Sequence, residues 1–325
     1  MKIIFFGNPG FAAENLEYLH NNGIDIISIV SSPDKEQGRG KKIMSTAVKQ
    51  KGKQLNINVL TPIKLKDDYL IKKLQTLNAD LFVVVAFRIL PKEVFQIPKM
   101  GTINLHTSLL PNYRGAAPIN RVLINGEKYT GITTFLIDET IDGGSILLQE
   151  KIDLSENITA GQLHNILMKK GSDLLIKTIN GIEDNNISPI FQKNDLATDA
   201  PKINKDLTRI NWKDSAINIH NLIRGLSPVL NENETLKDVS ICPGAWFMFK
   251  TSTTKIIRTK ILLSKFEKKT NNIIGSLETD NSSFLKINLS EGSILIEKLQ
   301  IAGKKSMNTS QFLVGNKIDL NWKIL

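Results

Sequence analysis

Cysteine is the scarcest residue of this chain, which has only Cys242 among its 325 residues. A single cysteine can form neither an internal disulfide nor a cysteine cage for zinc, and a lack of disulfides is typical of a reducing compartment. We therefore expect a cytoplasmic protein. The four histidines form no His-x-x-x-His pair and no His/Cys cluster, so we expect no metal site.

Long apolar runs are missing as well. At the N-terminus, the apolar stretch of MKIIFFGNPGFAAE ends at Gly7 and Pro9, which is too early for a secretory signal. No later run approaches the ~20 residues that cross a bilayer. We therefore expect a soluble protein that does not span a membrane.

Acidic residues are outnumbered, with 32 Asp and Glu against 42 Lys and Arg, for a net charge of +10. The excess is denser near the C-terminus, where the segment 250–269 carries seven basic residues and one acid, Glu267. Such a strip favours a polyanion, and RNA is the obvious one in the cytoplasm. A solubilising surface is the alternative, and charge alone leaves both open.

Strands and helices alternate over the first 184 residues. A strand, a glycine turn, a helix and a second strand open the chain, and such a unit implies a parallel sheet with a right-handed crossover. We therefore predict an α/β, Rossmann-like domain over 1–184. The expected strands cover 2–6, 25–30, 57–60, 81–86, 102–106, 133–137 and 145–152, and the expected helices cover 11–21, 64–77 and 161–182.

The rest of the chain has a different pattern. Residues 185–205 are polar and contain Pro189 and Pro201, so we place a linker there. Short alternating stretches then predict a small, OB-like β-barrel over 206–325. Its expected elements are a helix at 212–226 and strands at 246–251, 255–263, 273–277, 284–289 and 293–301.

The first turn, Gly7-Asn8-Pro9-Gly10, resembles a dinucleotide-binding loop only in outline. The G-x-G-x-x-G fingerprint needs a second glycine at position 9, where this chain has proline, and Ala13 stands three residues after Gly10. A tight turn that opens a helix accounts for these residues, so we do not expect NAD.

The best candidates for chemistry are Asn104, His106 and Asp142. Asn104 and His106 lie two apart on an expected strand, so both side chains face the same side. An amide can hold a carbonyl oxygen, an imidazole can exchange a proton near neutral pH, and a carboxylate can orient the imidazole. A histidine alone at a strand end is more often structural, but together these three groups indicate acyl transfer.

A basic loop, SSPDKEQGRGKKIMS, spans residues 31–45 and contains Arg39, Lys41 and Lys42. Charge runs are usually solvated surface. Loops at strand ends also host ligands, so a basic finger on a phosphate group is equally consistent.

The segment NLHTSLLPNYRGAAPIN (104–120) resembles the core motif of the methionyl-tRNA formyltransferases. The resemblance extends almost from end to end, through the opening MKIIFFGNPGFAAENLEYL, SSPDKEQGRGKK, ILP (89–91), APK (200–202), PGAW (243–246) and IAGKKSM (301–307). It implies an enzyme that transfers the formyl group of 10-formyltetrahydrofolate to the α-amine of methionine on initiator tRNA, without metal or NAD.

The resemblance also implies roles for individual residues. Asn104 and a protonated His106 would donate to the developing oxyanion, and Asp142 would stabilise the imidazolium and help relay the proton to N10 of the folate. Ser108, Leu109, Leu110 and Pro111 would line the folate site. Arg39, Lys41 and Lys42 would reach the acceptor end of the tRNA, and the barrel would hold its backbone. We expect a monomer.

Three positions depart from the family's usual residues. The opening has Gly-Asn-Pro-Gly-Phe instead of Gly-Thr-Pro-Asp-Phe. Arg88 replaces a glycine, which bears on the shape of the folate pocket. The loop Asp142-Gly143-Gly144 replaces Asp-Thr-Gly, so we expect it to be more flexible.

Two other functions stay open. The same chemistry could act on an amino sugar, on glycinamide ribonucleotide or on water, although a hydrolase would more naturally carry a regulatory domain first. The chain could also be an RNA-binding protein whose α/β domain has lost its activity. The basic C-terminal part favours an RNA acceptor over a small one.

Overall fold

The computed structural model describes residues 1–37, 42–236, 241–268 and 273–325. The chain forms two compact units. The first comprises Met1–Gly115, Gly131–Ile152 and Ile166–Asp199, and the second comprises Ala116–Thr130, Asp153–Asn165 and Ala200–Leu325. The units thus interleave along the sequence, and the contiguous division at 1–184, 185–205 and 206–325 stays a prediction.

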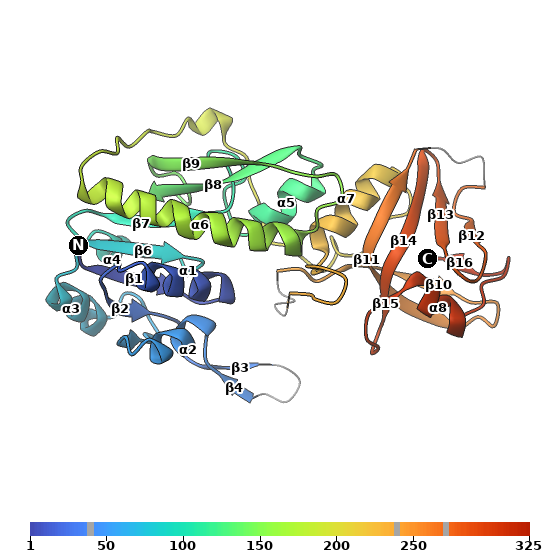
Figure 1. The fold of residues 1–325 in the computed structure, drawn as a ribbon, viewed down its shortest axis with the longest axis horizontal. Coiled ribbons are helices and arrows are strands. Elements are labelled where there is room, and N and C mark those ends of the chain that lie inside the picture. Colours follow the sequence, from blue (N-terminus) through green and yellow to red (C-terminus); the bar gives the residue numbers. More distant parts are fainter. Residues whose placement is uncertain (38–41, 237–240, 269–272) are drawn as a thin grey trace. The chain divides into compact units, whose positions relative to one another are not determined.

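A seven-stranded sheet forms the centre of the first unit (Figure 1). Its order is β5 (Val59–Leu60), β2 (Ile26–Val30), β1 (Ile3–Gly7), β6 (Leu81–Val85), β7 (Thr102–His106), β8 (Tyr129–Leu136) and β9 (Ile146–Asp153). The strands from β5 to β7 are parallel, whereas β8 is antiparallel to β7. The predicted Rossmann-like α/β fold is confirmed.

Helices cover both faces of this sheet, which is why β1 and β6 are buried along their whole length. On one face, Ile4 and Phe6 pack with Leu70 and Leu74 of α3 (Asp68–Leu77), beside α4 (Lys92–Phe95). On the other face lie α1 (Gly10–Asn21) and α6 (Ala160–Glu183), which a hydrogen bond from Ser172 Oγ to Asn15 Oδ1 joins at 3.0 Å.

The basic segment after β2 contains structure that the sequence did not reveal. It holds an antiparallel hairpin of β3 (Lys35–Gln37) and β4 (Lys42–Met44), followed by α2 (Ala47–Gln54). The helix was missed because AVKQKGKQ is almost entirely polar and buries only Val48 and Gly52. Arg39 and Lys41 lie outside the described residues, and Lys42 begins β4.

The second unit contains an antiparallel, nearly closed barrel that is consistent with the predicted OB-like fold (Figure 1). Its core centres on Phe247, Phe249 and Phe312. The strand order is β12 (Leu277–Thr279), β13 (Leu285–Leu289), β14 (Gly292–Ile301), β11 (Ile256–Glu267), β10 (Ala245–Lys250) and β16 (Lys323–Ile324), and β15 (Met307–Asn308) pairs with β14. The unit also has the helices α5 (Pro118–Ile124), α7 (Ala216–Leu226) and α8 (Thr309–Gly315).

Several predicted boundaries in this unit were wrong, and the strand expected at 255–263, for example, continues to Glu267. The helix expected from residue 212 begins at Ala216, because the Ser215 side chain caps it by accepting a hydrogen bond from Asn218 N. The strand expected at 273–277 begins only at Leu277, since Ile273 and Ile274 are exposed rather than paired in the sheet.

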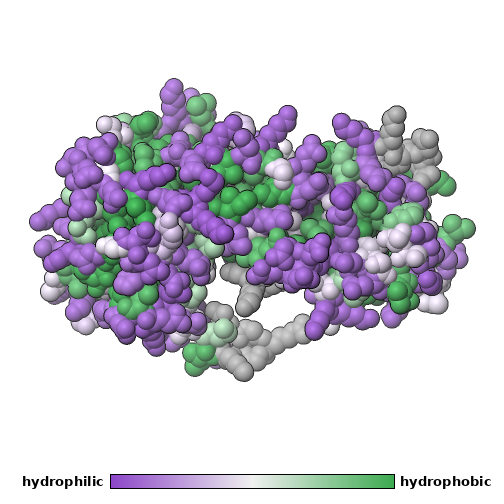
Figure 2. Space-filling view, viewed as in Figure 1, coloured by the Kyte–Doolittle hydropathy of each residue, from purple (hydrophilic) through white to green (hydrophobic). Residues whose placement is uncertain are grey.

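Hydrophilic side chains dominate the visible surface in Figure 2. Within the described ranges, every helix is too short or too polar to cross a bilayer.

Candidate active site

His106 is the last residue of β7, at the carboxyl end of the parallel strands, where α/β sheets bind their ligands. Its side chain is 7% exposed. Nε2 lies 2.8 Å from the Tyr113 carbonyl oxygen. Because a carbonyl only accepts, Nε2 carries a proton, and Nδ1 is the nitrogen left for proton exchange.

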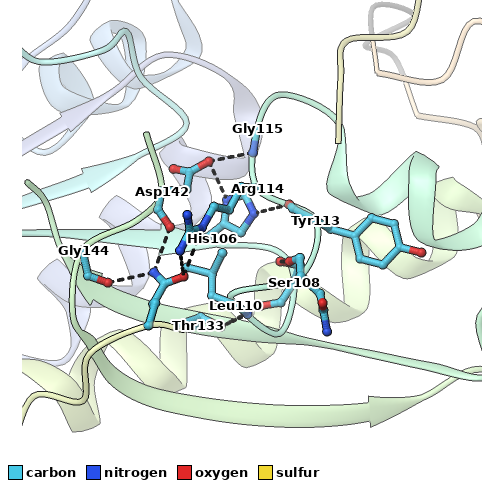
Figure 3. Close-up of polar contacts among 11 residues, drawn as sticks. His106, Ser108, Leu110, Tyr113, Arg114, Gly115, Thr133, Asp142 and Gly144 are labelled. Carbon is cyan, nitrogen blue, oxygen red and sulfur yellow. Dashed lines mark hydrogen bonds and ion pairs between the residues drawn. The ribbon is translucent and has the colours of Figure 1, made fainter. Parts of the chain in front are cut away.

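Asp142 approaches His106 from the loop between β8 and β9 (Figure 3). Its Oδ2 lies 3.7 Å from His106 Nδ1 and accepts a hydrogen bond from Gly115 N at 2.8 Å. Asp142 has φ +50°, in the left-handed region that aspartate tolerates better than most residues. The loop conformation thus turns the carboxylate toward the imidazole.

Asn104 lies two residues before His106 on the same strand, between Val84 of β6 and Phe135 of β8. The two side chains therefore point to the same side of the sheet. Asn104 is partly exposed, and among the described residues its side-chain amide has no hydrogen-bond partner. Within the described ranges, this amide is therefore available for a further hydrogen bond.

The turn after His106 is held by hydrogen bonds to the neighbouring strands. Thr133 Oγ1 of β8 donates to Ser108 O at 2.7 Å and accepts from Leu110 N at 3.2 Å. Gln149 of β9 donates to Leu110 O at 2.9 Å. The backbone from Ser108 to Pro111 is therefore anchored next to the imidazole.

Gln192 and Arg114 form further hydrogen bonds beside the Asp142 loop. Gln192 Nε2 donates to Asp142 O at 2.8 Å and to Gly144 O at 2.7 Å. Gln192 Oε1 accepts from Arg114 Nε at 3.1 Å and from Arg114 Nη2 at 2.7 Å, and Nη2 also donates to Asn194 Oδ1. Gln192 was not predicted as a site residue, because the segment 185–205 around it is polar and without periodicity, which is typical of a linker.

Arg88, which replaces the family's usual glycine, bends back onto the loop after β5. Its guanidinium donates to the carbonyl oxygens of Pro62 and Ile63 at 3.0 and 3.1 Å, and lies over the Phe87 ring at 5.2 Å. Burial lowers the pKa of Arg88. Its Nε is buried and finds no hydrogen-bond partner in the part of the chain that the structure describes.

The basic strip 250–269 divides into two parts on the barrel. In one part, Arg258 lies 3.9 Å from the centre of the Trp246 ring, and Arg209 lies 5.7 Å from it. Lys260 pairs with Trp246 across the strands, and its pKa is lowered by burial and by the charge of Arg258. We call Arg209, Trp246, Arg258 and Lys260 the Trp246 face. Among the described residues, none of its cations has an acidic partner within ion-pair distance.

In the other part, the charge of Lys265 is neutralised by an acidic partner. Lys265 Nζ lies 2.6 Å from a Glu297 carboxylate oxygen, and Glu267 pairs with Lys286 at 2.8 Å. In the whole described part of the chain, no group of three or more His, Cys, Asp or Glu side chains could hold a metal ion.

Comparison with known proteins identifies both halves of the chain. A formyl transferase model matches residues 1–179, and a model of the formyl transferase C-terminal domain matches residues 202–317. The methionyl-tRNA formyltransferase of Clostridium acetobutylicum is 44% identical over 321 residues, which are 98% of each chain. That of Clostridium beijerinckii is 41% identical over 323 residues, or 99% of each chain.

Solved structures agree on the fold. A sugar 3N-formyl transferase, crystallised with dTDP and 5-N-formyl-THF, aligns with a TM-score of 0.61 at 21% identity, over 94% of this chain and 99% of that one. At this identity the likeness concerns the fold alone. The family models and the full-length relatives together show that the chain belongs to the formyl transferase family, and within it to the methionyl-tRNA formyltransferases.

Proposed function

We propose that the chain transfers the formyl group of 10-formyltetrahydrofolate to the α-amino group of methionine on initiator Met-tRNA, which gives N-formylmethionyl-tRNA for translation initiation. The observation that carries this function is the identity of 44% with a methionyl-tRNA formyltransferase over 98% of both chains. The arrangement of Asn104, His106 and Asp142 supports it, because these groups suit acyl transfer. We call these three residues the β7 site.

In the proposed reaction, the methionine amine attacks the formyl carbon, and the carbonyl oxygen becomes an oxyanion. Asn104 donates its side-chain N–H to this oxygen, which suits the free amide of Asn104. One such donor contributes about 3–4 kcal/mol to lowering the barrier. The bond to N10 of the folate then breaks, so a proton must pass from the amine to N10.

His106 is the proposed proton carrier. Nε2 is engaged by Tyr113 O, so Nδ1 takes the proton from the amine and returns it to N10. Asp142 stabilises the imidazolium formed in between, since its carboxylate lies 3.7 Å from Nδ1. The amine thus loses one proton, N10 gains one, and the enzyme is unchanged after the cycle.

For the folate we propose the turn Ser108, Leu109, Leu110 and Pro111 as one wall of the site. The anchoring of this turn by Thr133 and Gln149 supports a preformed pocket. Arg88, at the position of a usual glycine, would change the shape of the folate pocket on the side of Pro62 and Ile63.

For the RNA we propose two contact regions. The first is the basic segment with Arg39, Lys41 and Lys42, which would meet the acceptor end. The second is the Trp246 face, whose cations have no acidic ion-pair partner within the described ranges and can therefore contact the phosphate backbone. We also propose that the protein is a monomer and acts in the cytoplasm.

One assay separates this function from its alternatives. The purified protein is incubated with 10-formyltetrahydrofolate and, in parallel, with charged initiator tRNA, glycinamide ribonucleotide or water alone. We expect rapid formylation of Met-tRNA and only background turnover in the other two reactions. Faster formylation of glycinamide ribonucleotide, or hydrolysis at the same rate, would reject the tRNA acceptor.

A further inference from the structure

Gln192 contacts the loop of the proposed catalytic carboxylate without touching the carboxylate itself. It belongs to the segment just before the short 3₁₀ helix Asn194–Leu196. Its side-chain amide joins two parts of the first unit that are far apart in the sequence, Arg114 on one side and the Asp142 loop on the other.

The partners of Gln192 allow only one orientation of its amide. Nε2 faces two carbonyl oxygens, those of Asp142 and Gly144, and Oε1 faces two guanidinium N–H groups of Arg114. A flipped amide would set an acceptor against acceptors and donors against donors. The two bonds from Arg114 are charge-assisted, which makes them about twice as strong as neutral ones. Gln192 is therefore a fixed bridge.

The bridge closes a ring of contacts around Asp142. Arg114 is followed directly by Gly115, whose N–H donates to Asp142 Oδ2 at 2.8 Å. Arg114 is also held through its backbone N–H, which donates to Thr198 O at 2.8 Å. The loop backbone and the carboxylate of Asp142 are thus tied to adjacent residues of one turn, the first through Gln192 and Arg114 and the second through Gly115.

The conformation of the loop explains why such a tie is needed. Asp142 has φ +50°, and Gly143 follows it, so the loop has little intrinsic stiffness. Asp142 Oδ2 lies 3.7 Å from His106 Nδ1, and a shift of the loop would weaken this interaction, because electrostatic stabilisation depends on a fixed geometry. We propose that Gln192 is a positioning residue that acts through Asp142, an inference that rests on the proposed function.

The test compares two substitutions of Gln192. Gln192→Met removes the donor and the acceptor at similar size. Gln192→Glu keeps an acceptor for Arg114 but loses both donations to the Asp142 loop. For both variants we expect kcat for Met-tRNA formylation to fall about 10-fold to 100-fold, as for other displacements of catalytic groups. KM for either substrate should stay within about twofold, because the bridge contacts no substrate in this scheme.

Gln162→Met is the matched control. Gln162 is also half-buried and also bonds two backbone groups, accepting from Thr159 N at 3.0 Å and donating to Leu230 O at 3.2 Å, but it lies in the second unit. Its loss should lower the melting temperature about as much as Gln192→Met while kcat is unchanged. An equal fall of kcat in this control would show that general destabilisation explains the effect, and would overturn the proposal.

A double-variant cycle with Asp142→Asn separates this proposal from the function on which it rests. If Gln192 acts through Asp142, adding Gln192→Met to the Asp142→Asn variant should lower kcat by less than about twofold. Independent, multiplying losses would overturn the positioning role alone, as would a wild-type kcat in Gln192→Glu. Near-normal activity of Asp142→Asn by itself would overturn the catalytic assignment and the positioning role together.

Discussion

The β7 site and the Trp246 face both gather polar side chains, but their contacts differ. Around the β7 site, His106 and Asp142 each have a fixed hydrogen-bond partner from another part of the first unit. On the Trp246 face, Arg258 and Arg209 stack on an indole, and no described acid pairs with them. The contacts of the β7 site fix the orientation of its side chains, whereas the cations of the Trp246 face keep a positive charge that can attract an anion. Substitutions in the first should therefore change kcat, and those in the second should change affinity and its salt dependence.

The largest effect is expected at Asn104. Asn104→Ala removes the proposed oxyanion donor and should lower kcat by about 10²–10³-fold with little change in KM. Asn104→Asp keeps the shape but replaces the donor by a negative charge, so it should lose at least as much. Steady-state kinetics with Met-tRNA measure both. If either variant keeps more than half of the wild-type kcat, the oxyanion role of Asn104 is wrong.

The sequence predicted those site residues whose signal lies within a few neighbouring positions, and missed those whose contacts are far away along the chain. Asn104 and His106 could be found because strand periodicity is local, and Asp142 because glycines flank it. Gln192 could not be found, since its partners lie 48 to 78 residues away in the chain and depend on the tertiary fold. The same applies to the fold, in which apolar strands such as β6 were predicted closely while the polar α2 was not.

The next effect concerns the loop that carries Asp142. A Cβ on Gly144 would lie 1.7 Å from Leu136 O, and backbone cannot give way cheaply. Gly144→Ala should lower the free energy of unfolding by about 3 kcal/mol and reduce kcat as the loop shifts. Thermal or urea unfolding measures the first change. An unchanged stability would show that the loop adapts and is not held rigidly.

Gly143→Thr, which restores the family's usual residue, is the companion to that test. A Cβ there would lie 2.4 Å from Thr140 Cγ2 and 2.7 Å from Thr140 Cβ. We expect a loss of about 1–2 kcal/mol, part of which the second substitution Thr140→Ala should restore, because it removes Cγ2 but keeps Cβ. The absence of any recovery would mean that the clash with Thr140 is not the cause.

On the Trp246 face the expected effects are smaller. Arg258→Ala removes a cation that no described acid neutralises, so the Kd for initiator tRNA should rise about fivefold at 0.1 M salt. The slope of log Kd against log salt concentration should fall by about one, while kcat at saturating tRNA is unchanged. Filter binding at salt concentrations between about 50 and 200 mM measures this slope. An unchanged slope would mean that this cation faces only solvent.

The smallest effect is expected at Lys265, which lies in the same basic strip but pairs with Glu297 at 2.6 Å. The sequence could not separate Lys265 from Arg258, because the partner of Lys265 follows from the register between β11 and β14, and that of Arg258 from the register between β10 and β11. Exposed ion pairs contribute about 0–1 kcal/mol to stability, so Lys265→Ala should fold normally. It should also bind tRNA within about twofold of the wild type with an unchanged salt slope, because the removed charge was already neutralised. If Lys265→Ala and Arg258→Ala reduce the slope equally, local pairing is irrelevant and the whole strip acts as a diffuse positive field. A normal Lys265→Ala beside a weakened Arg258→Ala would instead confine RNA binding to the unpaired cations.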